Sequence, residues 1–285
     1  MNKPIVLFIL FIILTAFAGD KKTYQLYSKE GKKVKYDKMM KSLEEADVIF
    51  FGEQHNNPIN HWLQLQVTKD LFEIHKEKLV LGAEMFERDN QLLIDEYLDG
   101  LITKNNFEKE VRLWPNYKTD YAPLLEFAKE NDLDFVATNI PRRYASVVYG
   151  KGFEALEELN ELALEFVAPV PIAYDPELKG YKDMLEMGGG HGGENLPKAQ
   201  AVKDATMAWS ISEHAGPGKV FIHYNGTYHS NNFEGILWYL NQYKPGLKIV
   251  TIASEEQDNI DKLDDDKEGL ADFILITPSD MTRTY

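Results

Sequence analysis

The sequence of 285 residues contains no cysteine. This absence excludes disulfide bonds, thiolate nucleophiles and thiolate metal ligands, so the fold depends on its packed core alone. It also leaves no N-terminal cysteine to which a lipid could be attached. We therefore expect no lipid anchor.

Positive charge is scarce. The chain has 31 Lys and Arg against 46 Asp and Glu, a formal net charge of -15. A protein that binds nucleic acid through its phosphates needs a basic surface, so we expect no nucleic-acid partner. A local basic pocket for a carboxylated ligand remains compatible with this balance. The 44% hydrophobic and 12% aromatic content is typical of a globular protein.

Only one long hydrophobic run is present. The sequence IVLFILFIIL (5–14) follows Lys3 and precedes AFA (16–18). This core is too short to span a bilayer comfortably, and the small residues match a cleavage site. We predict that residues 1–18 are a signal peptide cleaved near Ala18, and that the protein is periplasmic or secreted. An uncleaved anchor is the alternative.

Short apolar segments alternate with helical patterns along the rest of the chain. The predicted strands are 47–53, 78–84, 134–139, 219–226, 247–254 and 272–278. The predicted helices are 58–78, 88–100, 120–131, 152–166 and 196–214. This alternation predicts an α/β fold, with a mostly parallel β-sheet flanked by helices.

Two long intervals separate some of these strands. We predict that parts of 88–131 and 143–215 form an inserted small helical cap subdomain over one edge of the sheet. Residues 19–46 would be an N-terminal lead-in, and 47–285 the α/β domain itself.

Acidic and imidazole side chains follow three of the predicted strands. Glu53 and His55 follow the first, Glu84 ends the second, and the fourth carries His223 and is followed by His229. Ligands of parallel sheets bind beyond the carboxyl ends of the strands, so we expect these groups to converge on one cleft. Such a set suits general acid–base catalysis or a divalent metal.

Roles within that set stay open. Either Glu53 or Glu84 could be a general base, and His55, His229 and Glu53 could ligate a metal. A histidine at the end of a single strand is more often a satisfied structural group, and we interpret the helical His61, His75 and His214 in that way.

A glycine-rich stretch, MLEMGGGHGGEN (184–195), surrounds His191. Five glycines do not support a stable helix or strand. The stretch is either a flexible linker or a mobile lid that brings His191 to the cleft.

Several motifs together resemble one known family. In chain order they are GEQH, GAEMFERDNQ, DYAPLLEFA, ATNIPRR, AQAVKDATMAW and HYNGTYHS. They are similar to the ChaN-like family of the haem-binding uptake, Tiki superfamily, and the resemblance runs from about residue 47 to 254. It implies an α/β domain with a small helical subdomain that binds haem, in some members as a dimer.

Relatives in the wider superfamily are metal-dependent proteases and an esterase. The Glu and His positions that those enzymes use match Glu53, His55, Glu84 and His229. Further motif positions, expected to build the cleft wall, are Asp120, Tyr121, Asn139, Arg142, Arg143, Gln200 and Asp204.

The resemblance does not identify the haem iron ligand. The candidates are Tyr174, Tyr181 and His191, because tyrosine and histidine both ligate haem iron. Arg142 and Arg143 could bind the haem propionates, although surface arginine pairs are common. Two functions remain open: a haem-binding protein of bacterial haem and iron acquisition, or a hydrolase (esterase or metal-dependent peptidase).

Overall fold

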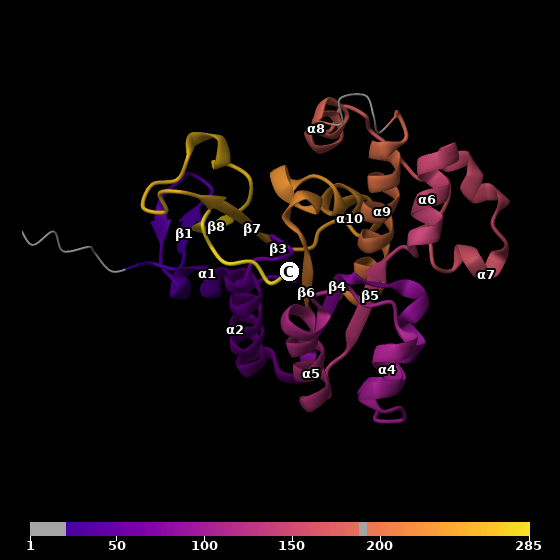
Figure 1. The fold of residues 1–285 in the computed structure, drawn as a ribbon, viewed down its shortest axis with the longest axis horizontal. Helices are drawn as coiled ribbons and strands as arrows, with labels where there is room; N and C mark the ends of the chain where they lie inside the picture. The colour runs from indigo at the N-terminus through magenta and orange to yellow at the C-terminus, as the bar shows by residue number, and fades with distance from the viewer. Residues whose placement is uncertain (1–20, 188–192) are drawn as a thin grey trace, which may run out of the picture.

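A single eight-stranded sheet forms the centre of the molecule (Figure 1). The computed structural model describes residues 21–187 and 193–285, so the predicted signal peptide and His191 lie outside the described residues. The strand order is β2-β1-β8-β7-β3-β6-β4-β5. The strands are β1 (Gln25–Ser28), β2 (Lys33–Val34), β3 (Val48–Glu53), β4 (Leu79–Glu87), β5 (Phe135–Asn139), β6 (Val220–Gly226), β7 (Ile249–Gln257) and β8 (Phe273–Pro278).

The six predicted strands are all present, and they pair in parallel. The predicted fold class is therefore confirmed. β4 and β7 continue three residues beyond their predicted ends. The short β1 and β2 were not predicted, and they extend the sheet beyond β8 by antiparallel pairing.

Alternate residues of the central strands face two separate cores, as the period of a strand requires. In β3, Ile49 and Phe51 belong to one core, whereas Val48 and Phe50 belong to the other. The first core is covered by α1 (Tyr36–Leu43), α2 (Pro58–His75), α3 (Gln91–Leu98), α4 (Lys104–Glu110) and α5 (Ala122–Glu130). The second is covered by α6 (Arg142–Lys151), α8 (Lys179–Met187), α9 (Leu196–His214) and α10 (Ile236–Tyr243).

The helices predicted to form the cap thus lie on both sides of the sheet. Those of 88–131 pack on the same core as α2, where α5 contacts α2, and those of 143–215 pack around α9 (Figure 1). The segment 152–166 is a 3-10 helix (Phe153–Glu158) followed by the short α7 (Glu161–Leu164), because Leu159 is extended and Asn160 caps a new helix. In the described part of the chain, no helix is long and apolar enough to cross a membrane.

Candidate functional site

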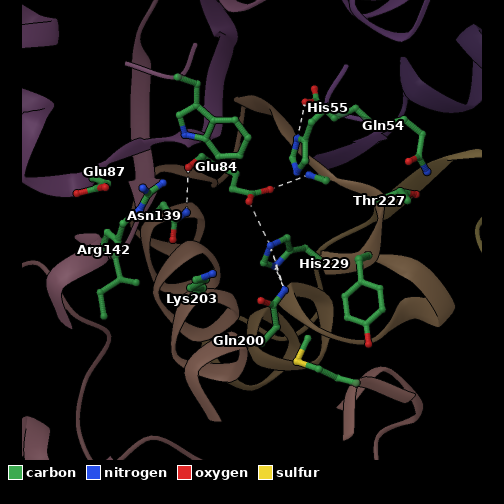
Figure 2. Close-up of a pocket in the computed structure, with 16 residues that line it drawn as sticks. Gln54, His55, Glu84, Glu87, Asn139, Arg142, Gln200, Lys203, Thr227 and His229 are labelled. Atoms are coloured by element: carbon green, nitrogen blue, oxygen red, sulfur yellow. Dashed lines mark hydrogen bonds and ion pairs between the residues drawn. The ribbon is translucent and has the colours of Figure 1, made fainter. Parts of the chain in front are cut away.

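The carboxyl ends of β3, β4 and β6 meet around one cavity. β6 lies between the other two strands, and Glu53 pairs in register with Gly226. The cavity has a volume of about 540 Å³. Glu53, His55, Glu84 and His229 all line it, so the structure brings these four together as expected. His223, the fifth, does not line the cavity, because its ring is fully buried. Figure 2 shows Glu84 between His55 and His229.

The first cluster in this cavity is built on Glu53. Its carboxylate is buried and lies 2.9 Å from His55 Nδ1. The same oxygen accepts a hydrogen bond of 2.8 Å from the Tyr121 hydroxyl, and the other accepts one of 2.6 Å from Gln64. Burial raises the pKa of Glu53, but the His61 charge and the His55 hydrogen bond outweigh it and lower the pKa. Glu53 is thus an anionic acceptor for the imidazole of His55.

His55 is the more accessible imidazole of the cavity. Its side chain is 33% exposed and packs against Trp114, with ring centroids 4.8 Å apart. Burial lowers the pKa of His55, but the hydrogen bond to Glu53 and the charge of Glu84 raise it overall. With Nδ1 bonded to Glu53, its Nε2 has no hydrogen-bond partner among residues 21–187 and 193–285.

A second layer of polar side chains lies behind this cluster. His61 Nδ1 is 3.6 Å from Glu53, and its Nε2 is 3.1 Å from the carbonyl oxygen of His55. Asn116 donates to the same carbonyl at 2.8 Å and to Asp120 at 2.6 Å. The sequence predicts a structural role for His61, and its ring supports the site through the backbone carbonyl of His55.

Glu84 reaches the cavity because β4 changes register there. The pairing of β4 with β5 is interrupted between Ala83 and Glu87, the kind of irregularity that re-aims a side chain at the end of a strand. One Glu84 oxygen accepts the backbone N–H of Gly226 at 2.7 Å. Its pKa is lowered: burial opposes ionisation, but the His229 charge and hydrogen bond outweigh burial.

His229 is held by carboxylates on both sides. Its Nε2 is 3.2 Å from Glu84, and its Nδ1 contacts Asp204, which also accepts a 2.8 Å hydrogen bond from Tyr181. Burial lowers the pKa of His229, but the two carboxylates outweigh it and raise the pKa to about 10. Because both ring nitrogens already have acidic partners, His229 is a buried cation that orders the site.

Gly226 allows His55 to approach the end of β6. A Cβ atom at this position would lie 2.7 Å from His55 Nε2 and 3.5 Å from a Glu84 oxygen. The space in front of Nε2 therefore exists only because residue 226 has no side chain.

Arg142 and Lys203 supply positive charge at the cavity wall (Figure 2). Each lacks an acidic partner within ion-pair distance in the described part of the chain. The other arginines there, namely Arg88, Arg112, Arg143 and Arg283, all pair with carboxylates. Arg143 pairs with Asp89 and stacks on Tyr144 instead of lining the cavity, so the predicted arginine pair is divided between two environments.

The tyrosines predicted as haem contacts lie behind the wall. Tyr181 is buried, bonds Asp204 and stacks on Tyr174, and neither ring is part of the cavity lining. His223 is also fully buried, between Thr138 and Asn225. Burial lowers its pKa to about 4, so it remains neutral.

The other motif residues divide into wall and support. Asn139, Arg142 and Gln200 line the cavity. Behind the lining, Tyr121 bonds Glu53 and Asp204 bonds His229, whereas Asp120 bonds Asn116. In the ranges that the structure describes, no group of three or more His, Asp or Glu side chains is arranged to hold a metal ion.

Sequence reasoning missed several contributors to the site. Lys203 and Trp114 line the cavity, and Gln64 and Asn116 belong to its supporting hydrogen bonds. Lys203 lies three residues after Gln200 on α9, a spacing that places the two side chains on the same face of the helix.

Comparison with known proteins agrees with the motifs. The solved structure of ChaN from Campylobacter jejuni, which concerns cofacial haem binding, superimposes with a TM-score of 0.68 at 19% identity. The match covers 90% of this chain and 97% of that one. An erythromycin esterase, EreC, matches with a TM-score of 0.48 and 13% identity, over 82% of this chain and 77% of that one.

A plant protein shares part of the sequence. Protein RETICULATA-RELATED 5, chloroplastic, of Arabidopsis thaliana is 24% identical over 127 residues, which is 42% of this chain. The present chain spans only 17% of that relative. The family model described as haem-binding uptake, Tiki superfamily, ChaN matches residues 39–240. The resemblance seen in the six motifs is thereby confirmed: the chain belongs to the ChaN family of the haem-binding uptake, Tiki superfamily.

Proposed function

We propose that this chain is an exported haem-binding protein of bacterial haem and iron acquisition, and that haem binds in the cavity at the strand ends. Membership of the ChaN family supports the ligand class. The observation that carries the assignment is the Nε2 of His55, which has no partner among the described residues. His55 lines the same cavity as Arg142 and Lys203, two cations without an acidic partner in that part of the chain.

The lining fits the contacts that haem requires. Haem, if bound here, would supply an iron that a protein side chain can ligate, and histidine is a common ligand. His55 has the arrangement of a ligating histidine, because its Nδ1 contacts a carboxylate while Nε2 is left for the metal. The other imidazole of the lining, His229, has both nitrogens occupied.

A haem is a flat apolar ring that carries two propionate carboxylates at its edge. Arg142 and Lys203 suit the carboxylates, since a guanidinium donates in a planar fork and an ammonium supplies a point charge. Trp114, Ile140 and Met184 supply apolar surface in the same lining. A homodimer remains a prediction from the family.

A haem titration tests the assignment. We expect haem added to the purified protein to shift the Soret band, and His55→Ala to weaken binding by about tenfold to a hundredfold. His75→Ala is the matched control, because His75 ends α2 and is not part of the lining. Absence of a Soret shift at micromolar protein would remove the proposal.

The neighbouring arginines provide a second matched pair. Arg142→Ala removes a cation from the cavity lining, and we expect it to lower haem affinity about tenfold. Arg143→Ala removes a residue that pairs with Asp89 outside the cavity, and its affinity should equal that of the wild type. Equal losses in both variants would contradict the proposed position of the propionates.

A hydrolase is the second candidate, and the contact between Glu53 and His55 favours it. A carboxylate that orients an imidazole with a free second nitrogen can serve as a general base for water. Glu84, held ionised by His229, would then stabilise positive charge near the reacting group. A panel of ester and peptide substrates tests this candidate: turnover by the wild type that is lost in Glu53→Gln would support it, and absence of turnover by the wild type would contradict it.

A further inference from the structure

The C-terminal residues return to the loop that carries His55. After β8 the chain crosses the rim of the sheet and ends beside β3 (Figure 1). The backbone N–H of Thr284 donates to the carbonyl of Asn56 at 3.0 Å, directly after His55. Arg283 fixes the same segment through an ion pair with Glu256.

The side chain of Thr284 makes a second, independent contact. Its hydroxyl donates to Asp120 at 2.7 Å. Asp120 is buried, accepts a 2.6 Å hydrogen bond from Asn116 and lies 3.5 Å from His61 Nε2. Thr284 therefore contacts both the loop itself and the carboxylate behind that loop.

Asp120 transmits this contact to the backbone of His55. Asn116 and His61, which also contact Asp120, both contact the carbonyl oxygen of His55, at 2.8 and 3.1 Å. A buried carboxylate that loses a hydrogen-bond donor rearranges toward its remaining donors or admits water. Either response would move the two groups that fix the His55 carbonyl.

We propose that Thr284 is a positioning residue, which holds the His55 ring in place through Asp120 and the Asn56 carbonyl. The segment 282–285 is thus part of the site although none of its residues lines the cavity. This inference rests on the proposed function only in treating His55 as the ligand-facing group. The position of the ring can be tested without haem.

The test compares three variants of the full chain. Thr284→Val removes the hydroxyl and keeps the shape, and Thr284→Ser restores a hydroxyl. Thr282→Val is the matched control two residues earlier, on an exposed threonine. The first readout is the set of His55 ring resonances in NMR spectra of the haem-free protein, assigned by their loss in His55→Gln.

We expect Thr284→Val to shift the His55 resonances well beyond the change seen in Thr282→Val, and Thr284→Ser to return them toward the wild-type position. In the haem titration, Thr284→Val should bind about fivefold more weakly than Thr282→Val. Should Thr284→Val not fold, Thr284→Ala serves as the second hydroxyl-free variant.

A lower unfolding midpoint without movement of the His55 resonances would overturn the inference, because it would describe a merely structural contact. Equal spectra for Thr284→Val and Thr282→Val would overturn it as well. Failure of the wild type to bind haem would remove the proposed function and leave the NMR comparison unaffected.

Discussion

Two imidazole–carboxylate clusters face each other across the end of β6, and they differ in how many contacts each ring makes. In the cluster of Glu53 and His55, the ring is 33% exposed and one nitrogen is unpartnered in the described structure. In the cluster of Glu84, His229 and Asp204, the ring is 6% exposed and both nitrogens contact carboxylates. The same residue types therefore serve different purposes.

The difference follows from the number of acidic neighbours and from burial. One carboxylate orients an imidazole and leaves its second nitrogen available, whereas two carboxylates fix it as a cation. The His229 cluster is thus suited to structural support and electrostatics, and the His55 cluster to ligand contact.

The largest expected effect is on folding stability. His229→Gln leaves Glu84 and Asp204 buried without their shared cation, and we expect it to lower the free energy of unfolding by about 3–5 kcal/mol. His55→Gln, at a partly exposed ring, should cost about 1 kcal/mol or less. Denaturant titration of both variants measures the difference. Equal losses would mean that the two clusters are not divided as described.

A smaller loss of stability is expected for a substitution at Gly226, which lies between His55 and Glu84. Gly226→Ala places a methyl group 2.7 Å from His55 Nε2, so the ring must move. We expect a loss of about 1–3 kcal/mol in stability and a haem affinity at least about tenfold lower. Gly150→Ala is the matched control, since a Cβ there meets nothing within 4 Å. Unchanged haem binding in Gly226→Ala would show that the space in front of Nε2 is not used.

The third expected effect is a decrease in the free energy of unfolding as pH rises. The folded protein raises the pKa of His229 from 6.5 to about 10. The contribution of protonated His229 to the free energy of unfolding is therefore complete below about pH 6.5 and is lost as pH rises to about 10. We expect a loss of up to about 1 kcal/mol per pH unit over this window. The slope should be absent in His229→Gln. Denaturant midpoints between pH 6 and 10, measured for both proteins, provide the check.

Much of this arrangement could be predicted from the sequence because parallel strands align their ends. Short β-branched runs located β3, β4 and β6, and the polar residues after them identified Glu53, Glu84 and His229. Periodicity could not show that β4 continues through an irregularity to Glu87, because that depends on its pairing with β5.

The division of roles was not visible in the sequence either. His55 and His229 each follow a glycine by three residues, yet Asp204, which distinguishes their surroundings, comes from α9. Likewise, Arg142 and Arg143 are adjacent, and only their contacts separate a cavity residue from a surface ion pair. In both pairs, contacts with residues far away in the sequence set the surroundings of each side chain.

The position of β6 between β3 and β4 also limits which ligands the cavity can accept. Backbone hydrogen bonds on both sides of β6 fix the spacing of the floor at about 4.8 Å per strand. Widening the floor would break the sheet, so ligands of different size must be accommodated by the walls, where α8 and α9 contribute Met184, Gln200 and Lys203. Substitutions on those two helices should therefore change which ligands fit the cavity, while the strands of the floor stay the same.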